Sequence, residues 1–135
     1  MLHVLLHMAQ ADGPMTSEQV AAMLGTNPVV VRRTMGGLRS AGYVTSEKGH
    51  GGGWTLAANL SDLSLLDIHK AVGGPKLFAI GHDSDNPDCA VERAVNKALD
   101  QTLAQAEALL LSKLSDVTLA DLAQDFARLC SPPRP

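Results

Sequence analysis

Two helix-start signals follow one another closely near the N-terminus, and this pair most constrains what the chain can fold into. Thr16-Ser17-Glu18-Gln19 has the pattern of a capping box. Asn27-Pro28 then places a capping residue before a proline in the first helical turn, and Gly25 ends the helix between them. The pattern predicts two short helices joined by a turn of about four residues, which is a helix-turn-helix.

A glycine-rich segment follows the second of these helices. Residues 43–46 and 54–57 are strand-like, and Gly49, Gly51, Gly52 and Gly53 lie between them. Two such segments around a glycine-rich turn are typical of a β-hairpin. A hairpin directly after a helix-turn-helix is a wing, so we expect residues 1–60 to form a winged helix-turn-helix.

The other segments are predicted to be helical. Residues 2–11 carry Leu2, Leu5, Leu6 and Ala9 on one face. Helices capped at Ser64 and Thr118 enclose an irregular stretch, residues 76–88, and a long helix from residue 89 to about residue 114. The predicted fold class is mainly α with a small β-hairpin: a winged helix-turn-helix over residues 1–60 and a helical dimerisation and regulatory region over residues 61–135, in one compact domain overall.

The long helix is apolar on more than one side, which indicates that more than one of its faces is buried against other segments. Apolar residues recur at steps of three and four, namely Val91, Val95, Leu99, Leu103, Ala106, Leu110 and Leu114. In a chain of 135 residues this favours packing against a second copy as well as against its own domain. The alternative is an ordinary core helix. A homodimer with two-fold symmetry would set its two DNA-reading helices about one DNA turn, roughly 34 Å, apart.

The formal net charge of −3 argues at first against a nucleic-acid partner, but the charge is uneven. Residues 1–58 carry four Lys/Arg and three acids, whereas residues 59–135 carry seven Lys/Arg and eleven acids. The bases of the first part fall within residues 32–48, where the predicted helix and wing lie. Double-stranded DNA is therefore the expected partner.

The second helix of the motif is expected to enter the major groove, with Val31, Met35 and Leu38 facing the core. Asn and Arg can contact bases through two hydrogen bonds, Val can contact a thymine methyl, and a helix start can hold a phosphate. The wing glycines allow a close approach to the minor groove. The predicted DNA-binding residues are Thr16, Ser17, Asn27, Pro28, Val29, Arg32, Arg33, Arg39, Lys48, Gly49, His50 and Gly51.

Several segments together resemble the Rrf2 family of transcription regulators over nearly the whole chain. They are residues 31–33, residues 38–44, Gly49-His50-Gly51-Gly52-Gly53-Trp54-Thr55-Leu56-Ala57, residues 65–72 and residues 117–122. The resemblance implies a winged helix-turn-helix, a long dimerisation helix and binding to pseudo-palindromic promoter DNA, with repression the expected sense. It also implies a further turn of helix ahead of Met1 in a full-length member.

The best-known members of that family bind an iron–sulfur cluster through three closely spaced cysteines near the start of the long helix. This chain has two cysteines, and only Cys89 lies in that region. We therefore expect no cluster and no other cofactor. Residues 86–91 resemble a single-cysteine branch of the family, and other members that lack a cluster respond through a protein co-regulator.

Cys89 is the candidate sensor. A position at the first turn of a helix favours a thiolate, so oxidation or alkylation there would change the dimer and its DNA affinity. The alternative is a small buried residue at a helix start. His3 and His7 are four residues apart on a predicted helix, but no third ligand is near in sequence, and we expect no metal site.

The residues show no nucleophile–base pair and no phosphate-cradling loop, so we do not expect an enzyme. The second function considered is a winged-helix module that binds a protein and not DNA. The chain has too few cysteines for a disulfide framework, and it has no apolar run of membrane-spanning length. These features predict a cytoplasmic protein with no membrane partner. A small-molecule effector bound near residues 76–89 also remains open.

Overall fold

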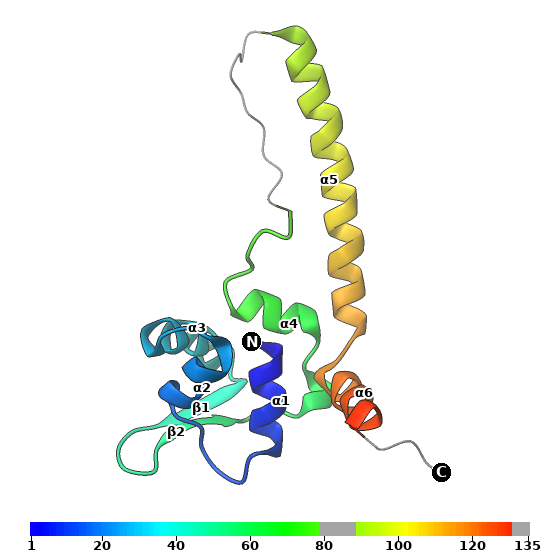
Figure 1. Ribbon diagram of the computed structural model, residues 1–135. Coiled ribbons are helices and arrows are strands. Elements are labelled where there is room, and N and C mark those ends of the chain that lie inside the picture. The colour runs from blue at the N-terminus through cyan, green and yellow to red at the C-terminus, as the bar shows by residue number, and fades with distance from the viewer. Residues whose placement is uncertain (79–88, 131–135) are drawn as a thin grey trace.

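The computed structural model describes residues 1–78 and 89–130. In these ranges the elements are α1 (Leu2–Gln10), α2 (Ser17–Leu24), α3 (Pro28–Ser40), β1 (Val44–Glu47), β2 (Gly53–Leu56), the 3-10 helix η1 (Leu60–Asp62), α4 (Leu65–Ala71), α5 (Ala90–Asp116) and α6 (Leu119–Cys130). We call residues 1–72 with residues 117–130 the body, and α5 the arm. Figure 1 shows the arm rising from the body as one long helix. The mainly α fold with a small hairpin is confirmed.

The predicted helix starts are confirmed by their caps. Thr16 Oγ1 accepts a hydrogen bond from the backbone N–H of Gln19 at 3.1 Å, and Gln19 Oε1 accepts one from the Thr16 N–H at 2.8 Å. Asn27 Oδ1 accepts from the N–H groups of Val29 and Val30. These side chains satisfy donors that have no partner inside a helix, so the local sequence alone defines where α2 and α3 begin.

The core lies where α1, α2, α3 and the wing meet. Val31, Met35 and Leu38 are 0–1% exposed, as their spacing on α3 predicts. The predicted inner face of α1 was wrong in part: Val4, Leu5 and Met8 are its buried residues, whereas Ala9 is exposed and Leu2 and Leu6 are half-buried. The buried face of α1 is determined by tertiary packing, because α1 contacts α2, β2 and α6.

The wing is fastened to the helix-turn-helix by backbone pairing. β1 and β2 run antiparallel, with Val44 opposite Leu56 and Glu47 opposite Gly53. Beyond this hairpin, Met15 and Trp54 exchange two backbone hydrogen bonds of 2.9 and 2.8 Å. At Gly53, with φ 154°, a Cβ would lie 2.6 Å from the Met15 carbonyl oxygen. Glycine is therefore needed at this position, because a side chain would push the two backbones apart.

Another glycine sets how closely α3 approaches α4. A Cβ on Gly37 would collide with the backbone carbonyl oxygen of Ala71 at the end of α4. The neighbouring Gly36 has nothing within 4 Å of the corresponding position. A glycine in mid-helix lowers helix stability. The close packing of α3 on α4 explains why Gly37 is a glycine, but it does not explain Gly36.

After the arm, the chain rejoins the body beside the residues at the start of α4. The N–H of Leu65 donates to Val117 O at 2.9 Å, and the N–H of Leu119 donates to Leu63 O at 2.8 Å. Leu119, the first residue of α6, is fully buried with Leu63 in the core of the body. Leu119 therefore completes a core that the preceding elements began.

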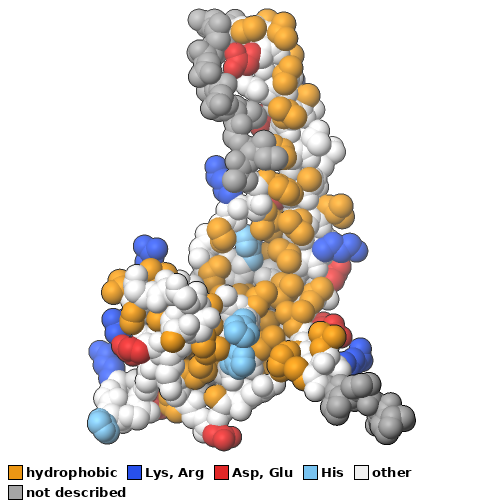
Figure 2. Space-filling model, in the orientation of Figure 1, with side chains coloured by type: hydrophobic (Ala, Val, Ile, Leu, Met, Phe, Trp, Pro, Cys, Tyr) orange, Lys and Arg blue, Asp and Glu red, His pale blue; other side chains and the backbone are white. Residues whose placement is uncertain are grey.

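The arm itself has no buried residue along its 27 residues. Hydrophobic side chains run along it to its base (Figure 2), and several are largely exposed: Val91, Val95, Leu99, Leu109 and Leu110. None of the described helices combines the length and the apolar character that crossing a membrane requires.

Candidate nucleic-acid interface

A surface groove of about 320 Å³ lies between α2, α3 and the wing. It brings together four residues that the sequence placed at a DNA interface, Ser17, Arg32, Arg39 and Lys48. The remaining lining residues are Ser46, Glu47, Gly53 and Trp54. Three cations and one carboxylate line the groove, so its side chains favour an anionic ligand.

Trp54 lines this groove from β2 of the wing. It is 7% exposed and belongs to the core cluster. Its indole Nε1–H donates a hydrogen bond to Ser17 Oγ at 3.0 Å, which ties β2 to the first residue of α2. The Arg39 guanidinium carbon lies 5.9 Å from the centroid of the Trp54 ring, within the range of a cation–π contact.

Arg39 connects the last turn of α3 to the wing. Its Nη1 donates to Ser46 Oγ on β1 at 3.1 Å. Because one guanidinium carries five N–H donors, this bond leaves others for a ligand. The side chain is therefore held on two sides while it keeps donors for a phosphate.

Arg32 pairs with Glu18 across the two helices of the motif. Their atoms Nη2 and Oε1 are 3.2 Å apart, and the side chains are 57% and 65% exposed. An exposed pair of this kind contributes at most about 1 kcal/mol and is weakened by salt. Breaking this ion pair so that Arg32 can contact DNA therefore costs little free energy.

The start of α3 is partly occupied by its own cap. Asn27 Oδ1 already accepts two backbone hydrogen bonds, so a contact through both its oxygen and its nitrogen to one base would compete with the cap. Its Nδ2 group is a donor that the cap does not use. Pro28 is half-buried, whereas Val29 is 70% exposed and offers an apolar contact at the helix start.

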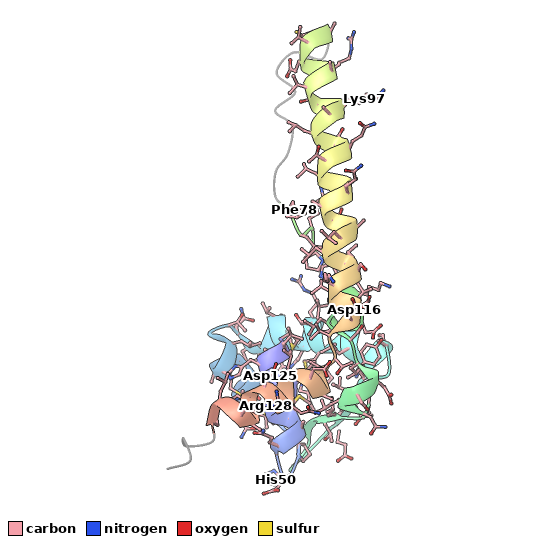
Figure 3. All side chains as sticks on the ribbon, turned by 90° about the vertical axis from the view of Figure 1, so that its right-hand side faces the viewer. His50, Phe78, Lys97, Asp116, Asp125 and Arg128 are labelled. Atoms are coloured by element: carbon pink, nitrogen blue, oxygen red, sulfur yellow. The ribbon has the colours of Figure 1, made fainter. Side chains whose placement is uncertain are left out.

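The other predicted contacts lie outside the groove. Gly49, His50 and Gly51 are exposed at the tip of the wing, and Figure 3 places His50 at the end of the body opposite the arm. Arg33 lies on another side of α3, where it lines a depression with the C-terminal end of α4. The Thr16 hydroxyl serves the cap of α2.

Four lining residues of the groove were not among the predicted DNA-binding residues: Ser46, Glu47, Gly53 and Trp54. Trp54 carried a signal, since it is the chain's one tryptophan in the predicted wing. Its partner Ser17 lies 37 residues earlier, and no local pattern reveals a contact over that separation.

A helix-turn-helix followed by a wing, with a basic groove between them, defines the class of winged-helix DNA-binding regulators. Comparison with known proteins makes the assignment narrower. The model of the Rrf2 family, described as iron-dependent transcriptional regulators, matches residues 1–125. The chain therefore belongs to the Rrf2 family and is a DNA-binding transcriptional regulator.

Individual relatives agree with this assignment. YwnA of Bacillus subtilis, an HTH-type transcriptional regulator by name, is 34% identical over 119 residues, which cover 87% of this chain and 88% of YwnA. The protein rrf2 of Nitratidesulfovibrio vulgaris is 30% identical over 131 residues, 96% of this chain and 83% of its own. A solved structure from Lactobacillus plantarum, a transcriptional regulator by name, superposes with a TM-score of 0.75 at 25% identity and covers 93% of this chain and 86% of its own.

The family description includes iron, and the residues of this chain do not fit a three-cysteine cluster. The chain contains two cysteines. Cys89 lies half-buried at the N-cap of α5, and Cys130 is exposed as the last residue of α6. The start of α5 and the helix α6 lie at opposite ends of the fold (Figure 1). Across residues 1–78 and 89–130, His, Cys, Asp and Glu side chains form no group of three or more that could hold a metal ion. His3 and His7, with Nε2 atoms 2.9 Å apart, are a pair without a third such neighbour in these ranges.

Proposed function

We propose that this protein is a homodimeric repressor that binds a specific inverted repeat in double-stranded promoter DNA. The observation that carries the proposal is the groove between α2, α3 and the wing, where Ser17, Arg32, Arg39 and Lys48 converge. Such a set offers hydroxyl and cationic donors to the DNA backbone, and backbone contacts fix the register in which a helix reads bases.

In the proposed complex, α3 lies in the major groove. Val29 and Arg32 face the bases, because Val29 is exposed at the helix start and Arg32 is one helical turn further along. Ser17, Arg39 and Lys48 contact phosphates. The tip of the wing, Gly49 to Gly51, enters the adjacent minor groove, where glycines allow the backbone to approach closely.

The proposed dimer forms through the arm. An uncovered apolar row on a helix of 27 residues is unfavourable in water, and a second arm related by two-fold symmetry would cover it. Val91, Val95 and Leu99 mark this row near the tip of the arm, at 72, 52 and 47% exposure. The two copies of α3 would then meet half-sites about one DNA turn apart.

We further propose that the regulator responds to a signal at the arm, with Cys89 as the responsive group. Cys89 is half-buried at the N-cap of the dimerisation helix, so its oxidation would change how the arm begins. A small molecule or a protein co-regulator is the other source of a signal. Loss of DNA affinity on oxidation, absent from the Cys89→Ser variant, would support the cysteine; equal affinity of the oxidised and reduced wild-type protein would refute it.

The test of DNA binding is selection from random duplexes by the purified, reduced protein, followed by sequencing of the enriched pool. The expected result is an inverted repeat with half-sites about one turn apart. A single enriched half-site would refute the proposed dimer, but sequence-specific DNA binding would still be supported. If no sequence is enriched at low salt, unaided sequence-specific binding is refuted, and a winged helix that binds a protein becomes the better description.

A further inference from the structure

We propose that Trp54 is a positioning residue which prepares Ser17, Arg39 and Ser46 to donate hydrogen bonds to a single DNA phosphate in the groove. This inference rests on the proposed DNA binding and adds to it the ligand group and the residue that arranges its site. It explains why a tryptophan on the wing is bonded to a serine of α2 and stacked beneath an arginine of α3.

The direction of the hydrogen bonds carries the argument. An indole N–H can only donate, so in the 3.0 Å bond between Trp54 and Ser17 the serine oxygen is the acceptor. This bond uses one of the two acceptor lone pairs of the hydroxyl and leaves its proton free to donate to another group. Trp54 therefore fixes the position of the Ser17 oxygen while the hydroxyl keeps its ability to donate.

The same logic holds on the other side of the groove. A guanidinium has no acceptor, so Ser46 Oγ accepts from Arg39 at 3.1 Å and keeps its own proton to donate. Arg39 is held between this bond and the face of the Trp54 ring, which reduces the entropy lost when it binds a ligand. Two donating hydroxyls and a fixed guanidinium converge on one space.

Such a set of donors selects an anion with several acceptor oxygens. Lys48 and Arg32 add positive charge to the same lining, and Glu47 is its one carboxylate. A backbone phosphate supplies the matching oxygens and charge, and charge-assisted bonds of this kind are the strong ones. The three donors that Trp54 arranges therefore position the duplex and do not read a base.

The experiment uses the selected operator duplex with one neutral methylphosphonate linkage placed at each position in turn. Wild-type protein should lose roughly tenfold in affinity at one linkage per half-site, the size of one hydrogen bond to a charged group. Ser17→Ala and Trp54→Phe should bind the unmodified duplex more weakly, and each should lose less affinity than wild type at that linkage, because fewer well-placed donors then reach the phosphate. Both should still respond at other positions.

Controls separate this inference from a loss of folding and from a failure of DNA binding. Ser61→Ala, an exposed serine of η1 outside the groove, should behave as wild type. The double variant Trp54→Phe/Ser17→Ala should lose less affinity than the sum of the two single losses, because both changes act on the same Ser17 contact. Ser17 is not part of the core cluster, so Ser17→Ala still tests the phosphate contact if Trp54→Phe does not fold.

The outcomes are distinct. Variants that bind as tightly as wild type, or that keep its response to every linkage, overturn the role of Trp54 while DNA binding stands. Wild-type protein that binds no duplex refutes the proposed function itself. Because Trp54 is the chain's one tryptophan, a change of its fluorescence on adding the unmodified duplex, reduced with the duplex that carries the critical methylphosphonate, would give independent support.

Discussion

Replacing each of the two adjacent glycines of α3 by alanine should change stability in opposite directions. Alanine in a helix interior is favoured over glycine by about 0.5–1 kcal/mol. At Gly36 the added methyl meets nothing within 4 Å, so Gly36→Ala should raise the free energy of unfolding by about that amount. At Gly37 the methyl collides with the carbonyl oxygen of Ala71, a backbone atom that moves only if α3 and α4 separate.

Overpacking of this kind costs about 1–3 kcal/mol, which exceeds the gain from helix propensity. We expect Gly37→Ala to lower the free energy of unfolding by about 1–2 kcal/mol and the two variants to differ by about 1.5–3 kcal/mol. Urea unfolding followed by circular dichroism, at one fixed protein concentration because a dimer is proposed, measures both. If Gly37→Ala is as stable as Gly36→Ala, the close packing of α3 on α4 is not the reason for the glycine.

Three further predictions follow from other parts of the molecule. Arg39→Ala should weaken binding to the selected duplex and reduce the slope of log K against log salt by about one; an unchanged slope would mean that Arg39 contacts no phosphate. Leu99→Glu should shift the dimer to monomer in sedimentation velocity, whereas Gln101→Glu, also exposed on the arm, should not; a dimer that survives Leu99→Glu argues for another interface. Hydrogen bonds from Ser64 lower the pKa of Asp67, so the carboxylate should stabilise the fold above its unfolded pKa of about 3.9 and lose that effect as the pH falls through the lower folded value; the stability lost in Asp67→Asn should therefore be largest near neutral pH, and an equal loss in strong acid would contradict the assignment.

The helix starts could be predicted because their causes are local. Thr16 with Gln19, Ser64 with Asp67 and Thr118 with Asp121 each form their cap within four consecutive residues. Any such cap can be read directly from the chain. The apolar spacing of α3 likewise predicted its three buried residues, because that helix has one dominant packed face.

The errors and omissions arose where distant segments meet. The buried face of α1 depends on three neighbours that its own sequence does not encode, and the reason for Gly37 lies at Ala71 in another helix. In the candidate site, the charged residues were predictable from their types and their place in the motif. The arrangement that Trp54 imposes on Ser17 and Arg39 needed the folded wing.

The return of the chain at Thr118 makes the arm an insertion in the body. Ser64 and Thr118 form a backbone bridge, so the chain rejoins the body beside the residue that precedes α4, and no residue of α5 is buried. At 1.5 Å per residue the 27-residue helix reaches about 40 Å. Whole turns of about 5.4 Å could therefore be added or removed at the tip of α5 without changing the groove between α2, α3 and the wing. In the proposed homodimer, where arm packs against arm, the length of α5 would limit how far apart the two bodies can lie and hence which operators the dimer can span.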